Sequence, residues 1–123
     1  MAAGAAWFNV ASAETPPVQT IAVAQGRLMA SQGALLIDVR EPDEYAEGHA
    51  PGSVLIPLGQ LPGRLAELRA SQDKPVALIC RSGRRSARAA EILRQAGFSK
   101  VYNIEGGMNA WSAAGLPVLK GAK

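Results

Sequence analysis

The sequence predicts a single α/β domain in which a mainly parallel sheet is covered by helices on both faces. Two continuous apolar runs, 34–39 and 76–79, have the length and composition of strands that are buried on both sides. Segments with strand character alternate with segments of helical periodicity, which is typical of parallel strands joined by helices. The chain has 123 residues, of which 48% are hydrophobic, and this is enough for one core.

The first half of the predicted domain contains two helices and two strands. Small and apolar residues over 21–30 indicate a helix, and the apolar strand 34–39 follows after a glycine. Proline and acidic residues from Pro42 are typical of the first turn of a helix. Glycine and proline within 48–52 mark a loop, and the short run 54–56 is predicted to be a strand.

The second half continues the alternation. Pro62 opens a predicted helix with leucines on one face at i, i+4 and i+7. After the strand 76–79, a helix over 86–96 carries an apolar stripe and ends before a glycine that is suited to its C-terminus. A strand over 100–104 and a helix over 107–114 complete the domain.

We expect the folded domain to span residues 18–119, between an N-terminal arm (1–17) and a short tail (120–123). The arm contains no Lys or Arg, and Ala11-Ser12-Ala13 resembles the small residues before a signal-peptidase cut, although a basic start is missing. The arm has three interpretations: a flexible arm, an expression remnant or a leader. The expected location is cytoplasmic, or periplasmic if residues 1–13 are the tail of an export signal. No apolar run approaches the ~20 residues of a membrane span.

The charge pattern favours a small anionic ligand over nucleic acid. The formal net charge is +3, and four of the cations are arginines within 81–88, where no aromatic residue is interleaved. One cysteine and one histidine exclude an internal disulfide and leave too few ligands for a protein metal site. We therefore expect no metal and no cofactor.

Cys80 is the strongest candidate for a catalytic residue. It follows the predicted strand 76–79 and precedes a loop that contains Gly83. A strand, a short glycine-containing loop and a helix N-terminus bring backbone N–H groups and partial positive charge together. A thiol in this setting loses its proton more easily than a free thiol. The alternative is a small buried hydrophobic residue, and the neighbouring arginines favour the reactive cysteine.

From about Val18 to Val118, the chain resembles a single-domain rhodanese, a sulfurtransferase module. The resemblance implies a three-layer α/β fold with a mainly parallel, five-stranded sheet. The matching segments, in order, are Leu36–Arg40 with Glu41 and Tyr45, Gly48–Ser53, Cys80–Ser86 and Gly106–Trp111.

The resemblance also implies the chemistry. Cys80 attacks the outer sulfur of a donor such as thiosulfate, releases sulfite, holds the sulfur as a persulfide and passes it to an acceptor such as cyanide or a thiol. Backbone N–H groups of residues 81–85 are suited to stabilise the charged sulfur. Arg81, directly after the cysteine, resembles the thiosulfate type of the family more than the mercaptopyruvate type.

The loop residues after Cys80 are the expected donor-binding residues. Arg85, the last arginine of the loop, is predicted to contact the anionic group of the donor, with a helix-surface arginine as the alternative. Arg81 and Arg84 supply a positive field, and Arg81 is also a candidate ligand. Ser82 and Ser86 are suited to hydrogen-bond the sulfur, although Ser86 is equally suited to cap a helix. Gly83 permits a positive φ or a close anion approach.

Four further residues are expected to be structural. Asp38 and Arg40 are predicted to pair near the rim of the site, as the resemblance implies. His49 invites the role of a catalytic base, but the mechanism of the family needs no histidine, so we expect a hydrogen-bonded loop residue. Trp111 is predicted to pack in the core, with its indole N–H satisfied.

Two other functions remain open at this point. Cysteine phosphatases and arsenate reductases also place a cysteine before a helix, but their arginine lies six positions after it, where this chain has Ser86. The second alternative is a carrier or interaction module that receives a persulfide sulfur from a partner protein. The expected partners are thus a small anionic sulfur donor, a thiol or cyanide acceptor, and a protein acceptor.

Overall fold

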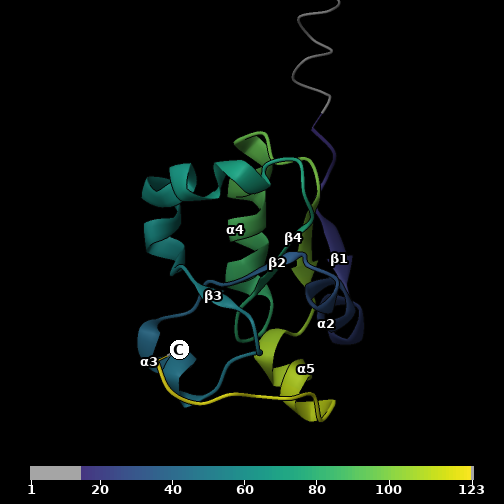
Figure 1. Cartoon of the computed structure of the whole chain (residues 1–123), viewed down its shortest axis with the longest axis vertical. Coiled ribbons are helices and arrows are strands. Elements are labelled where there is room, and N and C mark those ends of the chain that lie inside the picture. The colour runs from purple at the N-terminus through teal and green to yellow at the C-terminus, as the bar shows by residue number, and fades with distance from the viewer. Residues whose placement is uncertain (1–14, 123) are drawn as a thin grey trace, which may run out of the picture.

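A five-stranded parallel sheet forms the middle layer of the computed structural model, which describes residues 15–122 (Figure 1). Its order is β1-β5-β4-β2-β3, and every neighbouring pair is parallel. The predicted α/β class and the five-stranded parallel sheet are confirmed. The strands are β1 (Gln19–Ile21), β2 (Leu35–Asp38), β3 (Val54–Leu55), β4 (Val76–Ile79) and β5 (Val101–Ile104).

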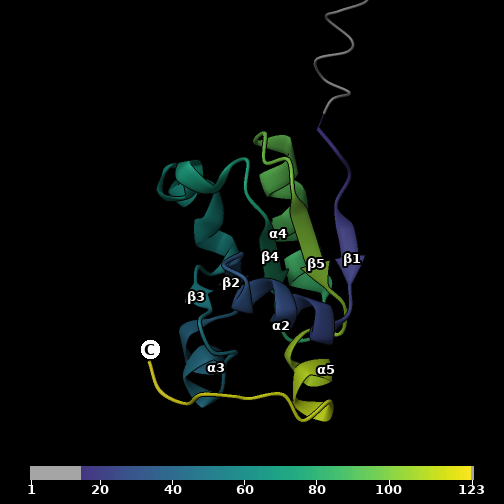
Figure 2. The ribbon, with the colours of Figure 1, turned by 45° about the vertical axis from the view of Figure 1, so that its right-hand side comes forward.

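Helices cover both faces of the sheet. On one face lie α2 (Val23–Ser31) and α5 (Gly107–Ala113), and on the other lie α4 (Arg84–Gln95) and the 3₁₀ segment η1 (Leu58–Ser71). The short helix α3 (Pro42–Glu47) follows β2. Figure 2 shows α2 in front of the sheet and α4 behind it.

Alternation along the central strands divides the core between these two layers. In β4, Ala77 and Ile79 pack towards α2 and α5, whereas Val76 and Leu78 pack towards α4 and η1. This follows because successive side chains of a strand point to opposite faces. Cys80 continues the alternation and joins the layer that contains α4.

The structure differs from the predicted elements in three places. Gln19–Ile21 is an edge strand, where the pattern predicted the start of a helix at Ile21. The predicted helix from Pro62 is part of the longer 3₁₀ segment η1. The predicted helix from Ser86 begins two residues earlier, at Arg84, so the loop after Cys80 is shorter than expected.

The C-terminal segment closes one end of the molecule. After α5 it runs across to α3 (Figures 1 and 2), where Leu119 forms an antiparallel bridge with His49 and the Gly121 N–H donates to the Ala46 carbonyl. The prediction of an arm or leader falls mainly on residues 1–14, which lie outside the described residues. Among the helices of residues 15–122, none combines the length and apolar character needed to cross a membrane.

Candidate active site

Cys80 lies directly after β4, at the edge of the sheet where the carboxyl ends of the parallel strands meet. Cys80 is buried, with 1% of its surface exposed. The Gly83 N–H donates a hydrogen bond to Sγ over 3.0 Å, and the Ser86 hydroxyl donates over 3.3 Å. The sulfur is therefore enclosed by donors from the loop and from the first turn of α4.

These donors change the acidity of the thiol. Burial raises the pKa of the Cys80 thiol, whereas hydrogen bonds from the Ser86 hydroxyl and from the backbone N–H groups of Ser86, Gly83 and Ser82 lower it. The hydrogen bonds outweigh burial, so the pKa lies below its ordinary value. Hydrogen bonding to the charged form favours that form, and the site therefore stabilises a thiolate.

Gly83 forms the turn between Cys80 and α4. Its φ of 102° lies in the left-handed region, which glycine adopts without a steric penalty. The predicted positive φ is confirmed. Gly83 also occupies the N-cap position of α4, so the alternative role of Ser86 as an N-cap is wrong.

Ser86 is instead a buried link between the sulfur and β5. Its hydroxyl lies 2.6 Å from the Asn103 side-chain oxygen as well as 3.3 Å from the sulfur. A hydroxyl has one proton, so these two acceptors share it. The Asn103 amide in turn donates to the Gly83 carbonyl over 3.2 Å. Asn103 was not among the predicted site residues, because nothing in a strand pattern marks a side chain that reaches a neighbouring loop.

The N-terminus of α5 fixes the backbone of the loop. The N–H of Met108 donates to the Cys80 carbonyl over 2.7 Å, and the N–H of Asn109 donates to the Arg81 carbonyl over 3.0 Å. Gly107 has a φ of 54°, and a Cβ there would overlap the Cys80 carbonyl oxygen. The paired glycines at 106 and 107 were the sequence signal for this close approach, but no role was predicted for them.

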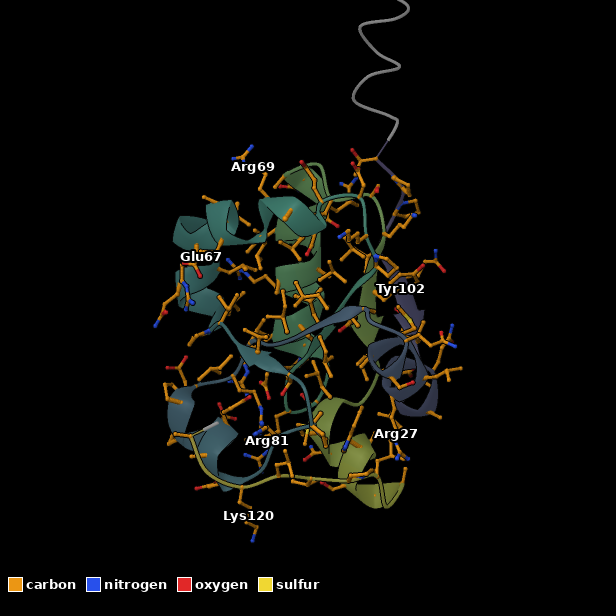
Figure 3. The ribbon with its side chains drawn as sticks, in the orientation of Figure 1. Arg27, Glu67, Arg69, Arg81, Tyr102 and Lys120 are labelled. Carbon is orange, nitrogen blue, oxygen red and sulfur yellow. The ribbon has the colours of Figure 1, made fainter. Side chains whose placement is uncertain are left out.

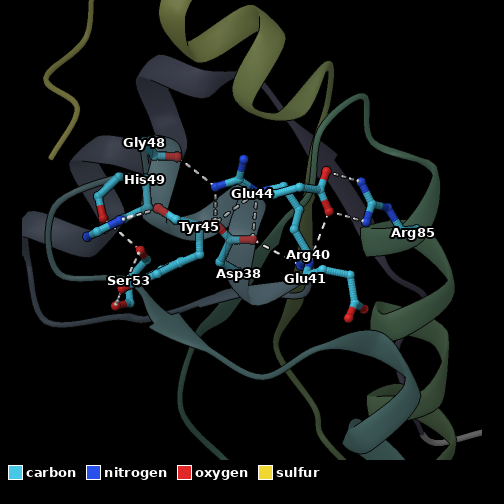
Figure 4. Close-up of polar contacts among 10 residues, drawn as sticks. Asp38, Arg40, Glu41, Glu44, Tyr45, Gly48, His49, Ser53 and Arg85 are labelled. Atoms are coloured by element: carbon cyan, nitrogen blue, oxygen red, sulfur yellow. Dashed lines mark hydrogen bonds and ion pairs between the residues drawn. The ribbon is translucent and has the colours of Figure 1, made fainter. Parts of the chain in front are cut away.

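The arginines around Cys80 differ in their partners. Arg81, Arg84 and Arg88 are exposed, and none forms an ion pair within residues 15–122. Arg85 donates from both terminal nitrogens to the two carboxylate oxygens of Glu44, each over 2.8 Å (Figure 4). The contact between Arg85 and a donor anion stays a prediction, and it has to compete with this pair. Glu44 was not predicted as a site residue.

The predicted pair of Asp38 and Arg40 is confirmed. Arg40 donates from Nε and Nη2 to the Asp38 carboxylate at 2.7–3.1 Å, and Nη2 also donates to the Gly48 carbonyl over 2.8 Å. Both side chains are buried. The charge of Arg40 is thus neutralised within the protein, and its guanidinium ties β2 to the loop after α3 (Figure 4).

His49 and Trp111 are both hydrogen-bonded, and Trp111 is packed in the core, as predicted. His49 is buried, its Nδ1 lies 2.8 Å from the Tyr45 carbonyl oxygen, and its ring stacks on that of Tyr45. Trp111 is also buried, and its indole N–H donates to the Pro117 carbonyl over 2.8 Å. The His49 ring thus lies against α3, and the Trp111 ring ties α5 to the C-terminal segment.

An open groove of about 570 Å³ lies beside the loop. Arg81 and Lys120 contribute positive charge to its lining, and Glu44 and Glu47 contribute negative charge. Figure 3 places Arg81 and Lys120 towards the same end of the molecule, far from Glu67. Of the residues that line this groove, Arg81 directly follows Cys80 in the chain, and Met108 donates to the Cys80 carbonyl.

Comparison with known proteins identifies the family. A profile described as the Rhodanese-like domain matches residues 22–114, which is most of the chain and includes the loop around Cys80. The chain belongs to the rhodanese-like domain family. The resemblance seen in the sequence is thereby confirmed.

Relatives of this rhodanese domain include named sulfurtransferases. It is 39% identical over 93 residues to a sulfurtransferase of Allochromatium vinosum, a match that covers 76% of this chain and 85% of that protein. It is 37% identical over 87 residues to a thiosulfate sulfurtransferase of Pseudomonas syringae, covering 71% of this chain and 80% of that protein.

A similar solved structure comes from Rhodopseudomonas palustris. It is described as a protein of unknown function and possible tyrosine phosphatase, with a TM-score of 0.75 and 30% identity. The match covers 83% of this chain and 85% of that one, so the two chains share the fold over most of their length.

The polar groups around Cys80 are hydrogen-bond donors and not metal ligands. Within residues 15–122, no group of three or more His, Cys, Asp or Glu side chains is arranged to hold a metal ion. Cys80 is accompanied by hydroxyl and N–H donors, which suit an anionic sulfur and not a cation.

Proposed function

We propose that this protein is a sulfurtransferase that carries a sulfane sulfur from thiosulfate to a thiol or cyanide as a persulfide on Cys80. The observation that carries the proposal is the donor set at Sγ, where the Gly83 N–H and the Ser86 hydroxyl lie at 3.0 and 3.3 Å. Membership of the family and the named sulfurtransferases among its relatives support sulfur transfer in general.

The reaction takes place in two displacements at sulfur. The Cys80 thiolate attacks the outer sulfur of thiosulfate, a new S–S bond forms, and the old S–S bond breaks as sulfite leaves with its electron pair. Cyanide or a thiolate then attacks the terminal sulfur of the persulfide. The S–S bond to Cys80 breaks, the thiolate of Cys80 is restored, and thiocyanate or a new persulfide leaves.

The loop has a role in both steps. The residues at 81–86 surround the sulfur with N–H groups and positive charge, and a charged sulfur in such a setting is stabilised without reorganisation of the protein. Gly83 and Ser86 donate hydrogen bonds to the sulfur, and the backbone N–H of Ser82 helps to lower the pKa of the thiol. Arg81 and Arg84 supply the field that favours approach of a small anion.

The length of the loop argues against phosphate ester hydrolysis. Only Arg81, Ser82 and Gly83 separate Cys80 from the start of α4, and the position six after the cysteine is Ser86, whose hydroxyl is engaged by Asn103. A tetrahedral oxyanion needs a wider ring of donors than a single sulfur atom does. Phosphatase activity, which is named as a possibility for the similar structure, is therefore the weaker candidate here.

Intact-mass measurement tests the proposal. After incubation with thiosulfate and denaturation, the protein should have gained the mass of one sulfur atom, and cyanide should remove it. No second cysteine exists in the chain, so the persulfide cannot resolve into an internal disulfide. Cys80→Ser should abolish both the added mass and turnover, because a hydroxyl remains protonated at neutral pH.

The outcomes also separate the alternatives. A serine variant that still transfers sulfur refutes the role of Cys80. A wild-type protein that gains no sulfur from thiosulfate but gains it from a persulfidated protein is a carrier. A protein that gains no sulfur from either source, and hydrolyses an aryl phosphate, is a phosphatase.

A further inference from the structure

The ion pair between Glu44 and Arg85 joins two elements that flank the active-site loop. Arg85 belongs to the first turn of α4 and Glu44 to α3, and the two hydrogen bonds of 2.8 Å form a bidentate fork (Figure 4). Glu44 also accepts the Glu41 N–H over 3.0 Å, which closes the capping box of α3. The carboxylate is thus held in place from two sides.

The pair persists over the whole physiological pH range. The hydrogen bond from Arg85 lowers the pKa of Glu44 to about 2, so the carboxylate stays charged. The pKa of Arg85 is raised, mainly by Glu44 and further by the charges of Cys80 and Asp38. Arg85 directly precedes Ser86, whose hydroxyl lies 3.3 Å from the Cys80 sulfur, and its partner Glu44 lines the same groove as Arg81.

Glu44 therefore occupies the guanidinium of an arginine in the first turn after the active-site loop. A carboxylate and the oxygens of thiosulfate compete for the same fork of N–H donors. The three other arginines around the loop, at 81, 84 and 88, are exposed, and exposed charges contribute less to binding than half-buried ones. The fractional exposure of the Arg85 side chain is 35% and that of Glu44 is 24%.

We propose that Glu44 is a specificity-determining residue, which occupies Arg85 and so disfavours thiosulfate relative to alkyl persulfide donors. Thiosulfate is a compact dianion and gains most from a free guanidinium. An alkyl persulfide carries a single charge on the sulfur that enters the donor set of Gly83 and Ser86, and does not need Arg85. This inference rests on the proposed transfer of sulfur through Cys80 and concerns how Glu44 sets the use of thiosulfate relative to an alkyl persulfide.

The test compares two donors in the Glu44→Gln variant. Glutamine keeps an oxygen for the Glu41 N–H but loses the charge that holds Arg85. With cyanide as acceptor, kcat/KM for thiosulfate should rise about three- to tenfold, mainly through KM. With the persulfide of N-acetylcysteine methyl ester, a neutral molecule apart from its sulfur, kcat/KM should stay within about twofold.

Glu67→Gln is the matched control. Glu67 forms a bidentate pair with Arg64 on η1, and Figure 3 places it far from Arg81. The substitution changes the net charge by the same amount without freeing Arg85, so the ratio of the two donors should not change. A rise equal to that of Glu44→Gln would mean that net charge alone acts, and would overturn the proposal.

A double-mutant cycle with Arg85→Gln separates occupation of Arg85 from the field of Glu44. If Glu44 acts by occupying Arg85, Glu44→Gln should give no gain for thiosulfate in the Arg85→Gln background. A gain that persists in that background overturns the proposal, as does an equal gain for both donors. If Glu44→Gln fails to fold, Glu44→Asp withdraws the carboxylate from Arg85 and should shift the donor ratio in the same direction.

Intact mass keeps this result apart from the proposed function. Each variant is incubated with the alkyl persulfide and the mass of the protein is measured. If the wild-type protein gains no sulfur, the proposed function fails. If every variant gains the sulfur but the donor ratio is unchanged in Glu44→Gln, only the role of Glu44 fails.

Discussion

At the scale of single residues, the reactivity of Cys80 depends on a balance between burial and hydrogen bonding. A buried thiol resists ionisation because a charge in an apolar setting is costly. Here the Gly83 N–H and the Ser86 hydroxyl lie close to the sulfur, and the resulting pKa of the thiol is below its ordinary value. In the proposed mechanism, the same donors serve the persulfide, whose outer sulfur also carries negative charge.

The acidity of the Cys80 thiol can be measured by its rate of alkylation. The rate of alkylation rises with the thiolate fraction, so its midpoint should lie below the ~8.5 of a free thiol. Ser86→Ala removes one donor to the thiolate, and should therefore move the midpoint to higher pH. Alkylation rates measured across a pH series report both values.

Ser31→Ala is the control for this measurement. The Ser31 hydroxyl donates to the Leu28 carbonyl on α2, so its loss should leave the midpoint of Cys80 where it is in the wild-type protein. A wild-type midpoint at or above that of a free thiol contradicts the assignment of a stabilised thiolate. An unchanged midpoint in Ser86→Ala contradicts the role of Ser86 alone.

At the scale of elements, the site is a junction of β4, α4 and α5. The first N–H groups of α5 donate to the carbonyls of Cys80 and Arg81, which gives the loop backbone partners that it cannot find within its own short turn. This contact requires the two backbones to approach closely. Gly107 makes the approach possible because it has no Cβ.

Gly107→Ala should therefore be strongly destabilising. The new methyl group overlaps the Cys80 carbonyl, and alanine is strained at a φ of 54°. We expect the free energy of unfolding to fall by about 2–4 kcal/mol, as measured by urea denaturation. In Gly63→Ala nothing lies within 4 Å of the added Cβ, and we expect a change below about 1 kcal/mol. Equal effects of the two substitutions would show that α5 does not fix the loop.

At the scale of the whole molecule, the charges divide into paired and unpaired groups. Arg40 and Arg85 are neutralised by Asp38 and Glu44. The exposed arginines at 81, 84 and 88 have no ion-pair partner within residues 15–122, and they lie on the loop and first turns that follow Cys80. Three of the unpaired cations that contribute to the net charge of +3 thus follow Cys80 closely in the chain.

Salt should therefore slow the reaction with an anionic donor. The screening length falls to about 10 Å at 0.1 M ionic strength, so kcat/KM for thiosulfate should decrease steadily as salt is added. The single-charged alkyl persulfide should depend less on salt. Both dependences are measured by initial rates in a salt series. Equal slopes for the two donors would contradict steering by the loop arginines.

The sequence alone determined the α/β class, the positions of the central strands and the place of Cys80. These features depend on local signals, namely apolar runs that are long enough for a doubly buried strand and a helical stripe that begins a few residues after the cysteine. The pair of Asp38 and Arg40 was also predictable, because its members are two residues apart and belong to a segment typical of the family.

The tertiary structure decided which partners these residues have. Glu44 and Arg85 are 41 positions apart, and Ser86 and Asn103 are 17 apart, so neither contact has a periodicity or spacing that a sequence pattern records. The edge strand β1 escaped prediction because only one of its three residues is buried, too few to show alternation. Contacts of this kind depend on how α3, α4 and β5 pack at the end of the sheet, and that packing assigns Arg85 to a carboxylate of the protein itself.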